Sequence, residues 1–290
     1  MLLVNAAELL SYKAYYIDKK MQKDAFKFSG ELALNYDRYL GPLMFEPYAV
    51  DLVSRINTEG VKAVLEIACG TGRVTKHLRN HFAPEVKLIA TDFNADMMSI
   101  AESKLNKGSV VFGIEDAQNL SFTDNSFDLV VCQFGLMFLQ DKKKGLSEAL
   151  RVLKPGGTFI FNTWDKTENI PLLKLIFNDI ILPYFKDEDT TRFLVPFSLF
   201  DTSILKGWME EAGFADVETN RVLLETGAPS AEEIVNGYFR KHALGGAVMA
   251  KNPADFDIVA GEMEKQVIAR FGGINIELQF SAILVSGKKP

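Results

Sequence analysis

The feature that most constrains the fold is the stretch VLEIACGTGRVT at residues 64–75. Its first residues are mostly apolar and β-favouring, as expected of a parallel strand that is covered on both faces. Small residues follow at Ala68, Gly70 and Gly72, where a ligand can lie against bare backbone and glycine permits a tight turn. A helix expected over 73–82 then directs its free N–H groups toward that turn. The stretch therefore predicts a strand, a ligand-binding turn and a helix.

An acid marks the carboxyl end of two successive predicted strands. Glu66 lies at the end of the first strand, and Asp92 ends the next one, 20 residues beyond Gly72. Open α/β sheets bind ligands at this edge, and an acid at that distance from a glycine turn can accept hydrogen bonds from a ribose diol. The alternative role for Asp92 is a helix cap, although Asn94 or Asp96 can itself cap the helix expected over 97–105.

Strand and helix patterns continue to alternate as far as Trp164. Further strands are expected at 110–113, 128–132 and 158–164, with helices over 42–56 and 146–153 and a KPGG turn at 154–157. Proline cannot continue the second of these helices, and the two glycines permit the turn that follows it. The alternation predicts a parallel sheet with helices packed on its faces.

These motifs resemble those of the class I S-adenosylmethionine (SAM)-dependent methyltransferases, in particular the type 11 and quinone-biosynthesis methyltransferases. EIACGTG is similar to the first motif of that family, with alanine at the usual first glycine. The loop LSFTDNSFD and the pattern EALRVLKPGGT follow in the family's order, so that five ordered motifs lie within residues 64–164. The nicotinamide fingerprint GxGxxG fits less well, because Thr75 stands where its third glycine would be.

The resemblance implies an α/β fold: a Rossmann-like, seven-stranded class I methyltransferase sheet, its last strand antiparallel, with helical cap insertions. The expected parts are an N-terminal arm (1–29), a SAM-binding core (30–164), a helical cap insertion (165–201), a continuation of the core (202–227), a second cap insertion (228–273) and the last core strand (274–290). The second insertion is expected to hold two helices, near 230–241 and 253–271. We expect the two insertions to meet around the methyl acceptor.

The resemblance also implies which residues bind SAM and its product S-adenosylhomocysteine (SAH). Tyr36 or Tyr39 is expected to close on the methionine part of SAM, with packing beneath the first helix as the alternative. Asp116 is expected to accept a hydrogen bond from the adenine amino group, with loop formation as its alternative. The complete expected set is Tyr36, Glu66, Ala68, Cys69, Gly70, Thr71, Gly72, Asp92, Phe93, Met97, Asp116, Ala117, Gln133 and Phe134.

Methyl transfer requires little catalytic chemistry from the protein, because the sulfonium of SAM already activates the methyl group. The transfer is an in-line displacement, so the main task is to align acceptor, methyl and sulfur. No nucleophile–base pair stands out in the sequence, and the catalytic residue is left open. His242 is a weak candidate for a base, with an exposed, helix-end histidine as the alternative. His77 and His81 lack a nearby third metal ligand and are expected to have surface or packing roles.

Composition limits the class of partner and the compartment. A net charge of −6 argues against a sequence-independent nucleic-acid binder, which needs a basic face. No apolar stretch reaches the roughly 18 residues of a membrane span. Cys69 and Cys132 both fall in the expected core, which suits a reducing cytoplasm. We therefore expect a cytoplasmic protein that acts on a small molecule, either as a monomer or as a homodimer.

The expected function is transfer of a methyl group from SAM to a small, apolar or aromatic acceptor. Many relatives that methylate nitrogen in nucleic acid or glutamine carry Asn/Asp-Pro-Pro-Tyr after the fourth strand, where this chain has CQFG at 132–135. That departure favours a small-molecule acceptor. Two alternatives stay open: a nicotinamide-dependent oxidoreductase, which shares the glycine turn and Asp92, and a catalytically silent SAM-binding protein.

Overall fold

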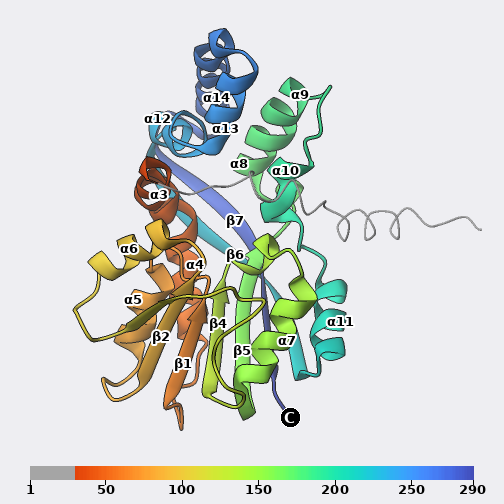
Figure 1. Ribbon diagram of the computed structural model, residues 1–290. Helices are drawn as coiled ribbons and strands as arrows, with labels where there is room; N and C mark the ends of the chain where they lie inside the picture. The colour runs from red at the N-terminus through yellow and green to blue at the C-terminus, as the bar shows by residue number, and fades with distance from the viewer. Residues whose placement is uncertain (1–29) are drawn as a thin grey trace, which may run out of the picture.

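The computed structural model describes residues 30–290 and contains one seven-stranded mixed sheet (Figure 1). The strand order is β3-β2-β1-β4-β5-β7-β6. The strands are β1 (Ala63–Ile67), β2 (Lys87–Asp92), β3 (Val111–Ile114), β4 (Phe127–Gln133), β5 (Leu153–Trp164), β6 (Ala215–Ser230) and β7 (Ile274–Lys288). β1 to β5 are parallel, and β7 runs antiparallel to both of its neighbours, β5 and β6. The predicted fold class is confirmed. The expected N-terminal arm, 1–29, lies outside the described residues.

Helices pack around the sheet because its central strands are apolar on both faces. β1 and β4 are buried along nearly their whole length, as parallel strands require. The N-terminal helical segment consists of α3 (Glu31–Asn35), the π-helix η1 (Tyr36–Phe45) and α4 (Glu46–Ser54). The other helices of the core are α5 (Arg73–His81), α6 (Ala95–Ser103), the 3₁₀ turn η2 (Leu136–Phe138), α7 (Lys142–Val152) and α11 (Thr202–Ala212). α4 packs on α5, and α7 packs on α11.

β6 and β7 extend beyond the other strands as a two-stranded antiparallel arm (Figure 1). Pairing between β5 and β7 ends at Trp164 and Ala282, whereas β6 and β7 stay paired as far as Ser230 and Ile274. The sequence predicts a shorter strand in place of β6, over 217–225, and β6 continues past the expected core boundary at 227. The arm carries the second cap away from the body of the sheet.

The second cap contains more helix than the sequence predicts. It is built from α12 (Ala231–Val235), η6 (Asn236–Arg240), α13 (Ala243–Lys251), η7 (Pro253–Asp255) and α14 (Phe256–Phe271). α13 is missing from the prediction because its glycines are poor helix formers. Tertiary packing explains one of them, since a Cβ on Gly245 would lie 2.3 Å from the carbonyl oxygen of Phe239.

The first cap contacts the second above the carboxyl ends of the strands (Figure 1). It is formed by η3 (Thr167–Asn169), α8 (Pro171–Leu173), η4 (Lys174–Ile181), α9 (Leu182–Tyr184), α10 (Thr191–Leu194) and η5 (Val195–Phe197). The Tyr184 hydroxyl donates to Asp255 over 2.7 Å, and Lys251 pairs with Glu188 at 2.9 Å. The caps thus meet through polar contacts. Within residues 30–290, no helix is both long and apolar enough to cross a membrane.

Candidate active site

The chain turns sharply after β1 through what we call the glycine loop, residues 68–72. Three of its residues have positive φ: Ala68 at 55°, Gly70 at 54° and Gly72 at 78°. A Cβ on Gly72 would also lie 2.7 Å from the Cβ of Ala101 on α6. Both conformation and close packing therefore require glycine at this position.

Asp92, at the end of β2, ties that strand to the glycine loop. Its Oδ2 accepts a hydrogen bond from the Gly70 N–H at 2.8 Å, and its Oδ1 accepts from the Asn94 N–H at 2.7 Å. Burial raises the pKa of the carboxyl group, and the backbone donors oppose that rise. The cap of α6 is Asn94, whose side chain accepts from Asp96 and Met97. The Phe93 N–H also bonds to this carboxyl group. A carboxylate can accept about four hydrogen bonds, so Asp92 keeps acceptor capacity that a ribose hydroxyl can use.

Glu66 is a buried acid with an unused acceptor atom. Its residue is 1% exposed, and its Oε2 has no hydrogen-bond partner among residues 30–290. Burial raises its pKa to about 8, and the negative charge of Asp92 adds to the rise. Cys69 is buried beside it, and burial raises the pKa of that thiol as well. A buried, unpaired carboxyl atom at the ligand edge of a sheet suits a hydrogen-bond donor or a cation.

The π-helix η1 lies against the glycine loop and brings Tyr36 to it. The Asp37 carboxylate accepts a hydrogen bond from the Thr71 hydroxyl at 2.7 Å. Burial raises the pKa of Tyr36, whose ring is close enough to Asp92 for that charge to contribute. Tyr39 lies elsewhere: its Cβ is 2.8 Å from the position of a Cβ on Gly237, in the second cap. Of the two tyrosines, Tyr36 is the one near the loop.

The end of β4 also reaches the glycine loop. Phe134 has φ 50°, and its N–H donates to the carbonyl oxygen of Asn162 at 3.1 Å. Gln133 donates through Nε2 to the Phe45 carbonyl oxygen at 3.1 Å. A Cβ on Gly135 would lie 2.5 Å from the Cβ of Ala68. These contacts place Gln133 and Phe134 at the same edge as the loop.

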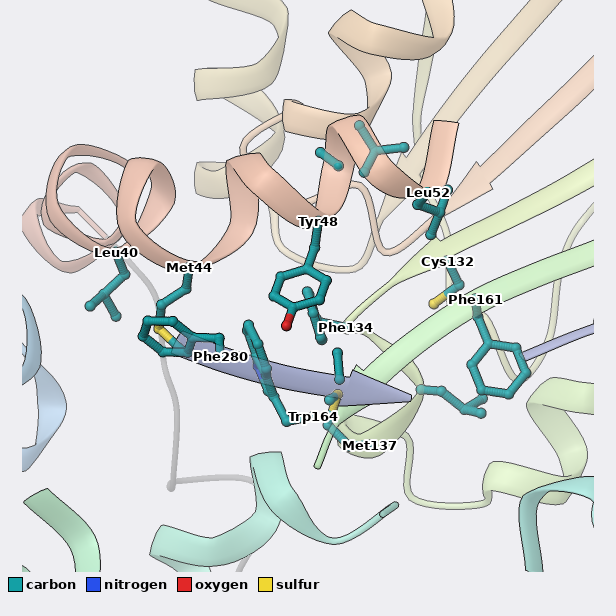
Figure 2. Close-up of a cluster of buried hydrophobic side chains, with 14 of the residues drawn as sticks. Leu40, Met44, Tyr48, Leu52, Cys132, Phe134, Met137, Phe161, Trp164 and Phe280 are labelled. Atoms are coloured by element: carbon teal, nitrogen blue, oxygen red, sulfur yellow. The ribbon is translucent and has the colours of Figure 1, made fainter. Parts of the chain in front are cut away.

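An aromatic cluster adjoins this edge (Figure 2). Phe134 and Trp164 stack with ring centroids 3.9 Å apart and planes 9° apart. Phe45 and Tyr48, from the N-terminal helical segment, meet the stacked pair edge-on at 5.3–5.7 Å. Phe280 of β7 completes the cluster at 6.0 Å from Trp164. Aromatic rings from four parts of the chain thus meet at the carboxyl ends of β4 and β5.

The remaining predicted ligands lie at the ends of β2 and β3. Phe93 is 76% exposed, and the Met97 Cε lies 3.6 Å from where a Cβ on Gly70 would be. Asp116 uses Oδ1 to accept from both the backbone and side-chain nitrogens of Gln118, at 2.9 and 3.0 Å. Ala117 beside it is buried. The assignment of these residues to adenine stays a prediction.

The histidines have local partners. His242 caps α13, accepting through Nδ1 from the Leu244 N–H at 3.3 Å, and burial lowers its pKa to about 4. Its alternative role as an exposed helix-end histidine favoured by the dipole is wrong, because His242 is part-buried and lies at the N-terminal end of α13. His77 Nε2 lies 2.7 Å from Glu46, and His81 Nε2 lies 2.9 Å from the Ile56 carbonyl oxygen. Residues 30–290 contain no cluster of three potential metal ligands.

Asp165 is a buried polar centre outside the predicted set of site residues. It follows β5 directly, just as Asp92 ends β2, and that position is the signal that could have identified it. Its Oδ2 accepts from Arg221 Nε at 2.8 Å, Ser281 Oγ at 2.8 Å and Asn169 Nδ2 at 2.9 Å. Burial raises its pKa, but these donors outweigh that effect and leave the pKa below its usual value. Asp165 therefore joins β5, the first cap and the arm.

Comparison with known proteins decides the family. A family model described as a methyltransferase domain matches residues 65–161. The chain is 35% identical over 179 residues to the ubiquinone/menaquinone biosynthesis C-methyltransferase UbiE of Saccharophagus degradans, covering 56% of this chain and 72% of that protein. It is 32% identical over 203 residues to a demethylmenaquinone methyltransferase of Staphylococcus epidermidis, covering 64% and 83%. The chain belongs to the class I SAM-dependent methyltransferase family.

Solved structures share the fold of this methyltransferase. A Haemonchus contortus phosphoethanolamine N-methyltransferase 2, in complex with phosphomonomethylethanolamine and SAH, has a TM-score of 0.60 at 17% identity, covering 94% of this chain and 60% of that chain. The YcgJ protein of Bacillus subtilis has a TM-score of 0.56 at 20% identity, covering 84% and 98%. The methyltransferase prediction, with SAM as methyl donor, is confirmed, and the oxidoreductase alternative is set aside.

Proposed function

We propose that this methyltransferase methylates a ring carbon of a small, quinol-type aromatic acceptor in the cytoplasm. The observation that carries the acceptor class is the similarity to relatives named as quinone-biosynthesis methyltransferases. The edge beside the glycine loop is apolar and aromatic: Phe45 is partly buried there, on a cluster of Tyr48, Phe134, Trp164 and Phe280 whose rings are buried against one another. An aromatic acceptor suits such an edge, since aromatic side chains favour stacked and edge-on contacts with another ring.

The residues around the glycine loop fit SAM. Gly70 has a positive φ and no side chain, and the space around it is open, so a ligand can approach its backbone closely. Glu66, with its buried and unpaired Oε2, offers an acceptor for the ammonium of the ligand, and Asp92 adds a second carboxyl group at the same edge. When bound, SAM supplies a methyl group that its positively charged sulfur has already activated. We assign the ribose to Asp92 and the adenine to Phe93, Met97, Asp116 and Ala117.

The protein contributes position and the exclusion of water. Tyr36 and Gln133 both contact Phe45 of the aromatic cluster, and Phe134 belongs to that cluster; we place the meeting of the methyl group and the acceptor beside these three residues. In the reaction a C–C bond forms at the ring carbon as the C–S bond breaks with its electrons left on sulfur, and the ring proton is lost to water. Holding the reacting atoms in line supplies about 7–11 kcal/mol in well-oriented systems.

The test is methyl transfer from isotope-labelled SAM to a panel of reduced quinols, catechols and amines. We expect label in the quinol, with mass spectrometry locating the new methyl on a ring carbon. SAH binding is measured in parallel by thermal unfolding, where SAH at 100 times its Kd should add about 2.7 kcal/mol. Binding without turnover on any acceptor would favour a catalytically silent SAM-binding protein. Label confined to catechol oxygen or to amines would refute the ring-carbon assignment.

The proposed location in the cytoplasm is supported by the two cysteines. Cys69 and Cys132 are both buried free thiols, as expected for a protein of a reducing compartment.

A further inference from the structure

Arg73 joins the glycine loop to the N-terminal helical segment. It is the first residue of α5, directly after the loop. Its Nη2 donates to the main-chain oxygen of Asp37 at 2.5 Å and lies 3.2 Å from the Asp37 carboxylate. Its Nη1 donates to Glu46 Oε2 at 2.9 Å. Asp37 and Glu46 lie at opposite ends of η1, so one guanidinium holds both ends of the π-helix.

The middle of η1 is shaped to admit this guanidinium. A Cβ on Gly41 would lie 1.9 Å from Arg73 Nη2 and 2.2 Å from its Cζ. The Arg73 head group therefore lies flat against the backbone at Gly41, where any side chain would displace it. Arginine can span such a site because its planar fork presents several donors, whereas a lysine ammonium is a single point.

Further contacts hold the N-terminal end of η1, at Asp37, against the glycine loop. Lys104, the C-cap of α6, donates through Nζ to the Asp37 carboxylate at 2.5 Å and to the Thr71 carbonyl oxygen at 2.9 Å. The Thr71 hydroxyl donates to the same carboxylate. The Arg73 side chain is 16% exposed, and charge pairs of this kind are screened less by solvent than surface pairs.

These contacts hold η1 across the edge at which we place SAM. Tyr36, the first residue of η1, is partly buried against the core, with Arg73 and Asp92 both near enough for their charges to act on it. A ligand bound to the loop beneath this helix would be released only after the helix moves aside.

We propose that Arg73 is a positioning residue that locks η1 over bound SAM or SAH and so sets how long the ligand stays bound. The inference rests on the proposed placing of SAM at the glycine loop. It concerns residence time, a property separate from whether SAM binds and from which acceptor is methylated.

The test compares SAH dissociation from the wild-type protein and from two variants, by stopped-flow displacement with excess SAM. Arg73→Ala removes the guanidinium, and Gly41→Ala displaces it without a change of charge. In both we expect SAH to dissociate about tenfold faster or more, since changes at a binding site act mainly on the off-rate. Arg73→Lys keeps the charge but reaches one end of η1 only, so its rate should stay close to that of Arg73→Ala.

The matched control is Arg55→Ala. Arg55 follows α4 in the same helical segment and pairs with Asp51 at 2.8 Å on the surface, so the variant loses one charge from the helix without touching the loop. Its SAH dissociation should equal that of the wild type. Amide hydrogen exchange of residues 36–45 supplies the second readout: SAH should slow exchange in the wild type and in Arg55→Ala, but much less in Arg73→Ala and Gly41→Ala.

The outcomes separate the two proposals. Wild-type SAH dissociation rates and SAH-dependent exchange protection in both Arg73→Ala and Gly41→Ala would overturn the locking role and leave the SAM site intact. Absence of SAH binding by the wild type would overturn the SAM site and the lock together. Equal loss of protection in Arg55→Ala would show that any charge change loosens the helix, and would also refute the role of Arg73.

Discussion

Two buried carboxyl groups in this protein have opposite pKa shifts because their neighbours differ. Glu66 has an oxygen without a partner, and burial raises its pKa to about 8. Asp165 is also buried, but Arg221, Ser281 and Asn169 all donate to it, and its pKa is lowered. Glu66 therefore has an oxygen that can bind a ligand, whereas Asp165 links parts of the protein to one another.

Glu66 should make the ligand-free protein less stable as the pH rises. Its pKa is raised from 4.5 to about 8 on folding, so the folded state binds more protons than the unfolded state between those values. Stability relative to Glu66→Gln should therefore fall by up to about 1.4 kcal/mol per pH unit across that range. Urea unfolding of both proteins from pH 5 to pH 9 checks this. A constant difference between them would contradict the assignment.

Asp92→Ala should weaken SAH binding by about tenfold to a hundredfold, because charge-assisted hydrogen bonds contribute roughly 1.5–3 kcal/mol. The variant also lacks the acceptor of the Gly70 N–H hydrogen bond. In the absence of ligand it should therefore be less stable than the wild type. Isothermal titration calorimetry with SAH gives the affinity. Unchanged affinity would mean that the ribose lies elsewhere.

At the scale of elements, local pattern predicts the strands and helices between 64 and 164 well. Their periodicity and their glycine and proline stops are encoded within a few residues, as for Gly72 before α5. Other elements depend on distant partners. Arg73 forms hydrogen bonds at both ends of the π-helix η1. Close packing of Gly245 on the backbone of Phe239 explains a glycine within α13. Similarly, the positions of Glu66 and Asp92 are predictable from motif spacing, whereas the Arg73 and Asp165 contacts are not.

Gly72 has two reasons to lack a side chain, its backbone conformation and its close packing on α6. Gly72→Ala should destabilise the protein by about 2–3 kcal/mol, as the sum of backbone strain and overpacking. Its control is Gly108→Ala, at φ 82° with no atom within 4 Å of the added Cβ, where strain alone costs about 1 kcal/mol. Thermal or urea unfolding of both variants measures the difference. Equal losses would exclude the contact with Ala101 as a factor.

At the scale of the whole molecule, Asp165 is the point at which the sheet, the first cap and the arm are joined. Asp165→Ala should destabilise the protein by about 3 kcal/mol at pH 7, because its loss leaves buried donors unpaired. Since its pKa is lowered in the folded state, this contribution is present above the unfolded value and should fade as the pH falls below about 4.

The control for Asp165 is Asp124→Ala. Asp124 pairs with Arg151 at 2.8 Å, but its side chain is 66% exposed, and exposed pairs contribute about 0–1 kcal/mol. Chemical denaturation of both variants at pH 3, 5 and 7 provides the comparison. Equal effects of the two substitutions at pH 7 would show that burial of Asp165 adds nothing.

The place of β7 has a consequence for how a nascent chain reaches this structure. β5 and β6 are separated in the sheet by β7 alone, yet β7 is translated after both of them. Until it arrives, each of these strands has a row of backbone groups without its final neighbour, and such open edges recruit other chains. Assembly must therefore end with a long-range insertion, which is slow, and the newly made protein is most prone to aggregate just before its last strand is available.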